Sequence, residues 1–370
     1  MPPRYAGPLT LRTLALVTHD LTRLVEHVRH QSRACHELGS PFYGVLLAHV
    51  ADDVEAGGPA ADVLRDRAGD PGPSAVALRL VGTAHRLALA GQAPDLAAHL
   101  PSTGGDGDPD AAWPALRTLL ETRAAEVRAG LELAPQTNET GRSAALLGAL
   151  LHVVGPEPLP VRLWELGASG GLNLLADQFR YVAADGGTWG PDSAVVLDPA
   201  WDTVPGAAPS DLSVIERVGG DLSPVDPTTP EGALRLESYV WPDQEARLAR
   251  LRAAISLAST VPVRRVRTGA AELLDSLELA EGALTVVWHS VMWQYVPRDE
   301  QERVTARLAQ LGALATPTSP LVHIAFEPRR LAPDGDYRFV VSARTWPGGQ
   351  ELLLGEAPAH GLPVSWGTPG

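Results

Sequence analysis

The sequence predicts an α/β protein in which a helical N-terminal region precedes a mostly parallel sheet with a C-terminal antiparallel hairpin. Three observations support this fold class. Apolar residues recur at helical spacing through the first 155 positions; strand-like and helical runs alternate after Pro160; and two strand-like runs flank a Pro-Gly-Gly turn near the end. We therefore expect a helical region over residues 1–155 and a sheet domain over residues 156–370.

The N-terminal helices are predicted from the spacing of apolar side chains. Between Thr18 and Leu38 these side chains recur mostly three or four positions apart, as in an amphipathic helix. Turn-rich stretches such as PSTGGDGDPD separate similar patterns, which cover residues 42–50, 75–90, 112–133 and 143–153. The first part of the chain is therefore expected to be mainly helical.

Short apolar runs predict the strands of the sheet. They read VRLWEL, VIERVG, VRRVRTG, LTVVW and LVHIAF, and helical stretches such as GLNLLADQF and WPDQEARLARLRAAISLA lie between them. Apolar strands that alternate with helices are typical of a parallel sheet covered on both faces. In the tail, YRFVVSART and QELLL flank Pro347-Gly348-Gly349, which predicts an antiparallel hairpin at the sheet edge.

Composition excludes several classes of function. The 370 residues include 44 acidic and 30 basic side chains, and the net charge of -14 repels nucleic acids and anionic membranes. All the basic residues are arginine, which excludes a lysine-dependent phosphate loop and a Schiff-base enzyme. Cys35 is the single cysteine, so an intrachain disulfide and a four-thiolate metal site are impossible.

The sequence also indicates the compartment and the partners that we expect for the protein. The sequence shows neither a signal-peptide core nor an apolar stretch of membrane-spanning length. We expect a cytoplasmic protein with a small-molecule substrate and no nucleic-acid or membrane partner; the oligomeric state is left open. No metal site is expected, because only His27 and His30 share a ligand-like spacing and no acid-rich segment follows them.

Residues 162–174, RLWELGASGGLNL, have two interpretations. Gly167-Ala168-Ser169-Gly170-Gly171 fits G-x-S-x-G, the turn that presents the nucleophile of a serine hydrolase, and Asp243 and His360 could complete a triad in chain order. With Glu165 the same residues fit an acid followed by a glycine-rich cofactor loop at a helix N-terminus. A strand leading to a nucleophile should be apolar, and no oxyanion loop precedes it. We favour the cofactor loop; a purely structural turn is the third alternative.

Further candidate residues follow the other predicted strands, where ligands bind in open parallel sheets. The second strand, VIERVGGDL, ends at Asp221-Leu222, and a carboxylate there could accept the ribose hydroxyls of a nucleoside. A solvated turn is the alternative. The long interval between Gly171 and Asp221 requires an inserted hairpin or lid. Trp241 either caps the cofactor or lies in the core.

The fourth strand, LTVVW, leads to His289, which is followed by Met292, Trp293, Gln294 and Tyr295. An imidazole there could act as a general base on a substrate hydroxyl or amine. Trp293 and Tyr295 could form an aromatic wall for a cation or a flat ligand. Alternatively, His289 donates to a carbonyl and the aromatic rings pack a helix. We name His289 and Tyr295 as candidate catalytic residues.

Several motifs resemble an actinobacterial family catalogued as domain of unknown function 2332. They are LWELGASGGLNLL, GGDLSPVDP, SYVWPDQEARLARL, TVVWHSVMWQYVP, the late Trp346-Pro347-Gly348-Gly349 with His360-Gly361, and Asn138-Glu139 with Arg142. The likeness covers nearly the whole chain. The family resembles class I S-adenosylmethionine-dependent methyltransferases in its C-terminal half, which implies a Rossmann-like sheet and S-adenosylmethionine as cofactor. The resemblance and the strand ends together nominate as cofactor-binding residues Glu165, Gly167, Ala168, Ser169, Gly170, Gly171, Asn173, Asp221, Leu222 and His289.

The third predicted strand departs from the methyltransferase pattern. Gly269-Ala270-Ala271 follow it, where relatives often have an aspartate and a methyltransferase usually has an acid or amide for the adenine amino group. This difference leaves a further alternative, a non-catalytic nucleoside-binding or interaction protein with the same fold, because fold does not fix function. The acceptor substrate and its reacting atom cannot be read from the sequence.

Overall fold

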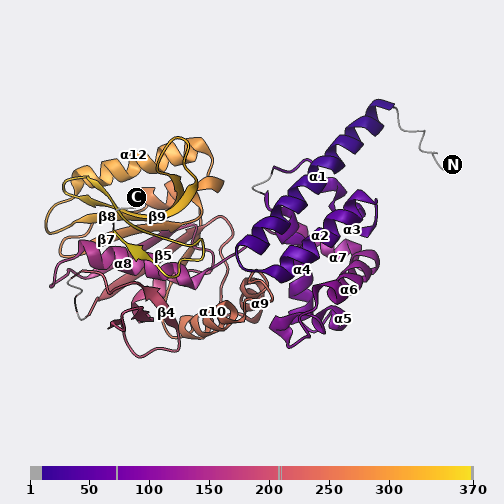
Figure 1. Cartoon of the computed structure of the whole chain (residues 1–370). Coiled ribbons are helices and arrows are strands. Elements are labelled where there is room, and N and C mark those ends of the chain that lie inside the picture. The colour runs from indigo at the N-terminus through magenta and orange to yellow at the C-terminus, as the bar shows by residue number, and fades with distance from the viewer. Residues whose placement is uncertain (1–10, 72–73, 207–208, 210, 368–370) are drawn as a thin grey trace. The chain divides into compact units, whose positions relative to one another are not determined.

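The computed structural model describes residues 11–71, 74–206, 209 and 211–367, and the chain forms two compact units. Unit 1 consists of Met1–Pro135 and Ser238–Glu245, and unit 2 of Gln136–Glu237 and Ala246–Gly370. Figure 1 shows the N-terminal helices and, in unit 2, a large sheet with helices packed on it. The predicted combination of a helical N-terminal region with a large, mostly parallel sheet is confirmed.

Unit 1 is built from helices around an apolar core. Ser40 caps α2 by accepting a hydrogen bond from the Tyr43 N–H, and Asp108 caps α6 in the same way. Trp241 is buried in the core of this unit, which confirms its interpretation as a core residue. The helices are α1 (Leu11–Glu37), α2 (Pro41–Glu55), α3 (Pro59–Leu64), η1 (Arg65–Arg67), α4 (Val76–Leu89), α5 (Pro94–Ala97), η3 (Pro101–Thr103), α6 (Pro109–Thr122) and α7 (Ala124–Leu131).

Unit 2 contains an eight-stranded sheet in the order β11-β10-β9-β8-β7-β1-β5-β6. Its strands are β1 (Val161–Leu166), β5 (Val214–Asp221), β6 (Arg264–Arg267), β7 (Leu284–Ser290), β8 (Leu321–Arg330), β9 (Tyr337–Trp346), β10 (Glu351–Ala357) and β11 (Ser365–Trp366). Parallel pairing joins β6, β5, β1, β7 and β8. The remaining strands pair antiparallel, including β9 with β10 across the predicted Pro-Gly-Gly turn. The strand order reverses at β1, which lies between β5 and β7.

Helices pack on this sheet through apolar side chains. Leu273 of α11 and Val304 and Leu308 of α12 share a buried cluster with Trp164 of β1 and Val287 of β7. Helix α8, which is apolar all round, packs on β8 and β9. The helical elements of unit 2 are η4 (Thr140–Arg142), α8 (Ser143–Val153), η5 (Asn173–Gln178), α9 (Pro230–Glu237), α10 (Glu245–Ala258), α11 (Ala270–Asp275), η6 (Trp293–Tyr295) and α12 (Arg298–Leu314).

A separate three-stranded sheet lies in the sequence between β1 and β5. It consists of β2 (Arg180–Ala183), β3 (Thr188–Trp189) and β4 (Val196–Trp201), in the order β3-β2-β4. Strands β2 and β3 form an antiparallel hairpin, as the predicted insertion requires. The Tyr181 ring stacks on Trp201 with a centroid distance of 4.9 Å, which gives the insertion an aromatic core of its own. Among the helices of the described residues, none combines the length and the hydropathy of a membrane-spanning segment.

Candidate functional site

The glycine loop, residues 167–171, turns over the ends of β1 and β5. The Gly167 and Ala168 amides both donate to the Gly220 carbonyl at the end of β5, at 2.9 and 3.1 Å. Gly167 and Gly171 have φ 69° and Ser169 has φ 52°, a left-handed backbone that glycine adopts without strain. The loop leads into the 3-10 helix η5 and then directly into β2. The loop is therefore followed by a short 3-10 helix and not by the α-helix that the cofactor-loop interpretation expects.

Neighbouring side chains of unit 2 cover the glycines of this loop. A Cβ added at Gly167 would lie 3.2 Å from Met292, and one at Gly170 would lie 2.9 Å from the Asn138 Oδ1. That oxygen also accepts the Leu172 N–H at 3.0 Å, so Asn138 holds the residue that follows the loop. A ligand that approaches Gly167 from the side of the added Cβ would meet Met292, whose unbranched side chain is flexible.

Glu165 is buried at the end of β1, with 2% of its surface exposed. Its Oε1 accepts hydrogen bonds from the Trp288 indole at 3.1 Å and from the Asn173 amide at 3.4 Å. Its Oε2 is buried and has no hydrogen-bond partner among the described residues. Burial raises the pKa of Glu165 to about 8. The carboxyl group is therefore mostly protonated at neutral pH and can donate a hydrogen bond.

Asp221 connects the end of β5 to the glycine loop. Its Oδ2 accepts the Ser169 N–H at 2.9 Å and its Oδ1 accepts the Ser223 N–H at 2.7 Å. The second contact is the turn interaction considered from the sequence, and the first clamps the loop. Leu222, the next residue, is 76% exposed. A half-buried carboxylate and an exposed apolar side chain thus lie together at this strand end.

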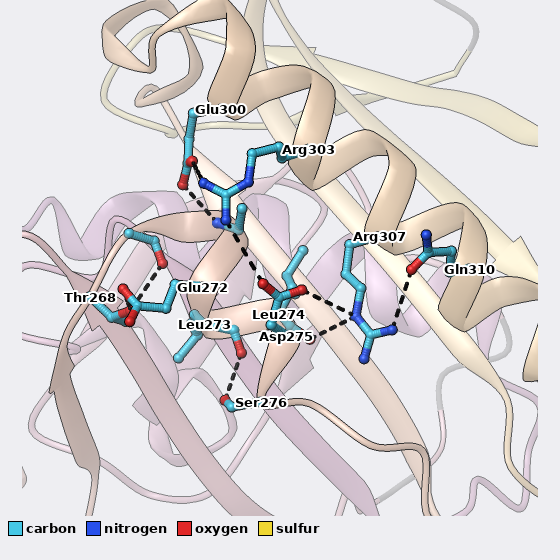
Figure 2. A network of polar contacts seen from close by, with 12 residues as sticks. Thr268, Glu272, Leu273, Leu274, Asp275, Ser276, Glu300, Arg303, Arg307 and Gln310 are labelled. Atoms are coloured by element: carbon cyan, nitrogen blue, oxygen red, sulfur yellow. Dashed lines mark hydrogen bonds and ion pairs between the residues drawn. The ribbon is translucent and has the colours of Figure 1, made fainter.

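A carboxylate from a distant helix lies at Gly269-Ala270-Ala271, the positions after β6 where the sequence has no acid. Glu300 of α12 accepts the Ala271 N–H at 2.8 Å, and a Cβ added at Gly269 would lie 3.0 Å from the same oxygen. Figure 2 shows Glu300 beside Arg303, while Arg303 and Arg307 reach Asp275 of α11. Sequence reasoning missed Glu300 because it is far along the chain, on a helix whose charges have the pattern of a solvated face.

His289, at the end of β7, forms a buried pair with Glu327 of β8. The imidazole Nδ1 lies 2.8 Å from the Glu327 Oε1, which also accepts the Met292 and Trp293 amides at 3.1 and 3.3 Å. Trp293 stacks on the imidazole with a centroid distance of 5.0 Å. Because a carboxylate accepts, Nδ1 carries the proton and Nε2 is left as the basic nitrogen. The partner is thus a carboxylate and not the carbonyl considered as the alternative, and the sequence analysis missed Glu327.

The His289–Glu327 pair lies in the wall of a cavity of about 790 Å³. The other lining residues come from η6, α12, β8, β9 and β10 and include Trp293, Leu308, His323, Arg329, Arg344 and Trp346. His323 Nε2 and Glu327 Oε2 are buried without a hydrogen-bond partner in the part of the chain that the structure describes. The glycine loop and Tyr295 lie outside this lining, and Tyr295 is 56% exposed.

A second charged cluster joins three of the sequence motifs. Glu139 is buried and accepts a hydrogen bond from the Arg247 Nε at 2.5 Å, and His360 lies 3.8 Å from the same carboxylate oxygen. Burial alone would raise the pKa of Glu139, but the charges of Arg247, His360 and Arg142 hold it at about 2. Burial, together with Arg247, lowers the pKa of His360 to about 4. At neutral pH the cluster therefore contains ionised Glu139 and neutral His360.

The three residues of the possible hydrolase triad have other neighbours. His360 belongs to the Glu139 cluster. Asp243 accepts hydrogen bonds from the Ser40 hydroxyl at 2.6 Å and from the Phe42 amide at 3.0 Å, within unit 1. The Ser169 Oγ is buried and no described residue hydrogen-bonds to it. Asp243 and His360, the two residues that could complete the triad, thus have interactions with other residues.

A sequence-family profile matches residues 25–366, and it is described as DUF2332, an uncharacterised protein conserved in bacteria. The chain belongs to the DUF2332 family. The DUF2332 match contains every residue of the loop, the cavity and the Glu139 cluster. Its description names bacteria and no narrower group, so the actinobacterial origin stays a prediction. No curated protein matches the chain.

Proposed function

We propose that this DUF2332 protein is an S-adenosylmethionine-dependent methyltransferase that acts on a small molecule. The strand order carries the proposal. In chain order, β6, β5, β1, β7 and β8 are the third, second, first, fourth and fifth strands of the parallel sheet. This is the Rossmann-like, doubly wound order, in which ligands bind where the order reverses, outside the carboxyl ends of the strands. The glycine loop and Asp221 lie at that position.

The residues at these strand ends fit a nucleoside group. The half-buried Asp221 carboxylate has lone pairs left for ribose hydroxyls, and the exposed Leu222 offers an apolar surface for a base. Glu165 Oε2 is a buried polar atom whose hydrogen bond no described residue satisfies. Met292 is the obstacle, because its side chain covers Gly167.

When bound, the cofactor would supply an electrophilic methyl group on a sulfonium. The chain's own residues would bind and orient the two reactants and exclude water, which favours loss of charge from the sulfonium. His289 Nε2 would accept the proton from the substrate hydroxyl or amine that receives the methyl group. Glu327 would hold the imidazole in the required tautomer and stabilise its protonated form, since it already accepts from Nδ1. Positioning and one base are sufficient for this reaction.

Isothermal titration calorimetry with S-adenosylmethionine and S-adenosylhomocysteine tests the proposal. We expect saturable binding of both by the wild type and weaker binding by Asp221→Ala, with Asp226→Ala as the control on the next acid along the chain. Absence of heat with both ligands would overturn the proposal. Binding without methyl transfer to any acceptor would favour the non-catalytic alternative, and covalent labelling of Ser169 by a fluorophosphonate would favour the hydrolase.

A further inference from the structure

The cavity beside His289 has the size and walls of a small-molecule site. Its volume of about 790 Å³ is in the range of pockets that enclose a ligand of drug size. Trp293, Tyr337, Phe339 and Trp346 supply aromatic surface from η6 and β9. Aromatic side chains pack most favourably against other flat rings, in stacked or edge-to-face contact. The walls therefore favour a flat ligand over a branched aliphatic one.

The charged side chains of the cavity pair with one another. Arg329 donates to Glu351 at 2.8 Å and to the Ser342 hydroxyl at 3.1 Å. Arg344 lies 3.7 Å from Glu351 and 5.8 Å from the centre of the Trp346 ring. Both arginines thus share a carboxylate, and Glu327 is held by His289 and two backbone amides. A ligand need not carry a net charge, because the positive charges of the two arginines already have a carboxylate partner.

Two hydrogen-bond acceptors at the cavity wall have no donor. Glu327 Oε2 is one of them. The second is His323, whose pKa is lowered well below its usual value by burial, by His289 and by the two arginines, so its ring is neutral. Its Nε2 has no partner within the described ranges and accepts in the Nδ1–H tautomer. A buried acceptor without a donor is unfavourable, and a ligand hydroxyl that reaches it removes that penalty.

One residue links this cavity to the glycine loop. The Met292 backbone amide donates to Glu327 at the cavity, and its side chain lies against Gly167. The cavity and the loop are therefore separated by little more than this residue. We propose that the cavity is the acceptor site of the enzyme and takes a flat, neutral aromatic molecule that carries a hydroxyl group, with the hydroxyl directed to Glu327 and His323, beside His289. That the bound molecule is the substrate that accepts the methyl group rests on the proposed function, whereas the existence of the binding site does not.

Calorimetric titration with three matched probes tests this inference. We expect 6-hydroxyquinoline to bind about tenfold more tightly than quinoline, the effect of one additional hydrogen bond. Quinoline-6-carboxylate should bind more weakly than 6-hydroxyquinoline, because both arginines are paired. Glu327→Gln should reduce the preference for the hydroxyl, and its melting temperature reports whether the variant folds. A preference for the carboxylate, or equal binding of 6-hydroxyquinoline and quinoline, would overturn the inference.

A pair of variants on α12 locates the binding site. Ala309 lines the cavity, whereas Ala306 lies on the same helix outside the lining, and both are exposed. Ala309→Trp should weaken 6-hydroxyquinoline binding by at least about tenfold, and Ala306→Trp should not change it. Equal affinities would place any binding elsewhere and overturn the inference.

The same titrations separate the two proposals. If S-adenosylhomocysteine binds and none of the three probes does, the cavity inference fails and the cofactor proposal stands. If 6-hydroxyquinoline binds in the cavity and S-adenosylhomocysteine does not bind, the methyltransferase proposal fails and the cavity remains a small-molecule site.

Discussion

Replacing Glu165 with glutamine should make the protein more stable at alkaline pH and should matter little in mild acid. The glutamine carbonyl can still accept from Trp288 and Asn173, and the amide group never ionises. In the wild type, burial favours the neutral carboxyl group, so that its pKa is about 8 against a usual value of 4.5. Ionising this group in the folded state is therefore unfavourable.

The size of this loss of stability and the pH range over which it occurs follow from these two pKa values. Below pH 4.5 the carboxyl group is protonated in the folded and the unfolded chain, and its contribution to stability is fully present. Above that pH the unfolded chain loses the proton first, and the free energy of unfolding falls by about 1.4 kcal/mol per pH unit until the folded group ionises near pH 8. The loss is about 3 kcal/mol at pH 7 and about 5 kcal/mol above pH 8.

Urea denaturation of wild type and Glu165→Gln between pH 5 and pH 8.5 measures this difference. The quantity of interest is the change with pH of the stability difference, because a constant offset from repacking then cancels. Glu157→Gln, at an exposed position, is the matched control and should show no such change. A stability difference between wild type and Glu165→Gln that stays constant over this range would refute a neutral carboxyl group at the end of β1.

Three further predictions concern the proposed site. Ser169→Ala should keep S-adenosylhomocysteine affinity, because the loop is held through the Ser169 amide and not its hydroxyl; loss of binding in calorimetry would contradict this. Asp221→Ala should weaken that affinity by about 1 to 3 kcal/mol, through the lost ribose acceptor and the lost clamp on the loop; unchanged affinity would leave Asp221 as a turn residue. His289→Gln should keep cofactor affinity and lower the methyl-transfer rate by about 100- to 10,000-fold. A lower melting temperature with an unchanged rate per folded molecule would instead make His289 structural.

Local sequence patterns predicted the parts of the fold that depend on neighbouring residues. The apolar runs became β1, β5, β6, β7 and β8, and the Pro-Gly-Gly turn joins β9 to β10. The helix predicted over WPDQEARLARLRAAISLA begins later than this stretch does, after Pro242, since α10 begins at Glu245. Asp243 instead accepts hydrogen bonds from Ser40 and Phe42 at the start of α2. This tertiary contact competes successfully with the local preference of proline for a first helical turn.

Partners from distant strands and helices could not be predicted in this way. His289 was recognised because it ends an apolar strand, but its partner Glu327 is 38 positions away on β8. Glu139 and Arg247 are separated by 108 positions and meet only in the folded chain. A single acid inside the apolar run LVHIAFEP is the one local signal of Glu327, because a buried carboxylate needs a partner. One sequence does not identify that partner.

The return of the segment Ser238–Glu245 to unit 1 affects how the protein can fold during synthesis. Trp241 belongs to the core of unit 1, yet it is made long after Pro135, once β1 and β5 have already been translated. Domains generally form as units on the ribosome, N-terminal ones first. Here the first unit remains incomplete until much of the second has emerged. A gene truncated after codon 135 would therefore encode a helical fragment that lacks part of its own core.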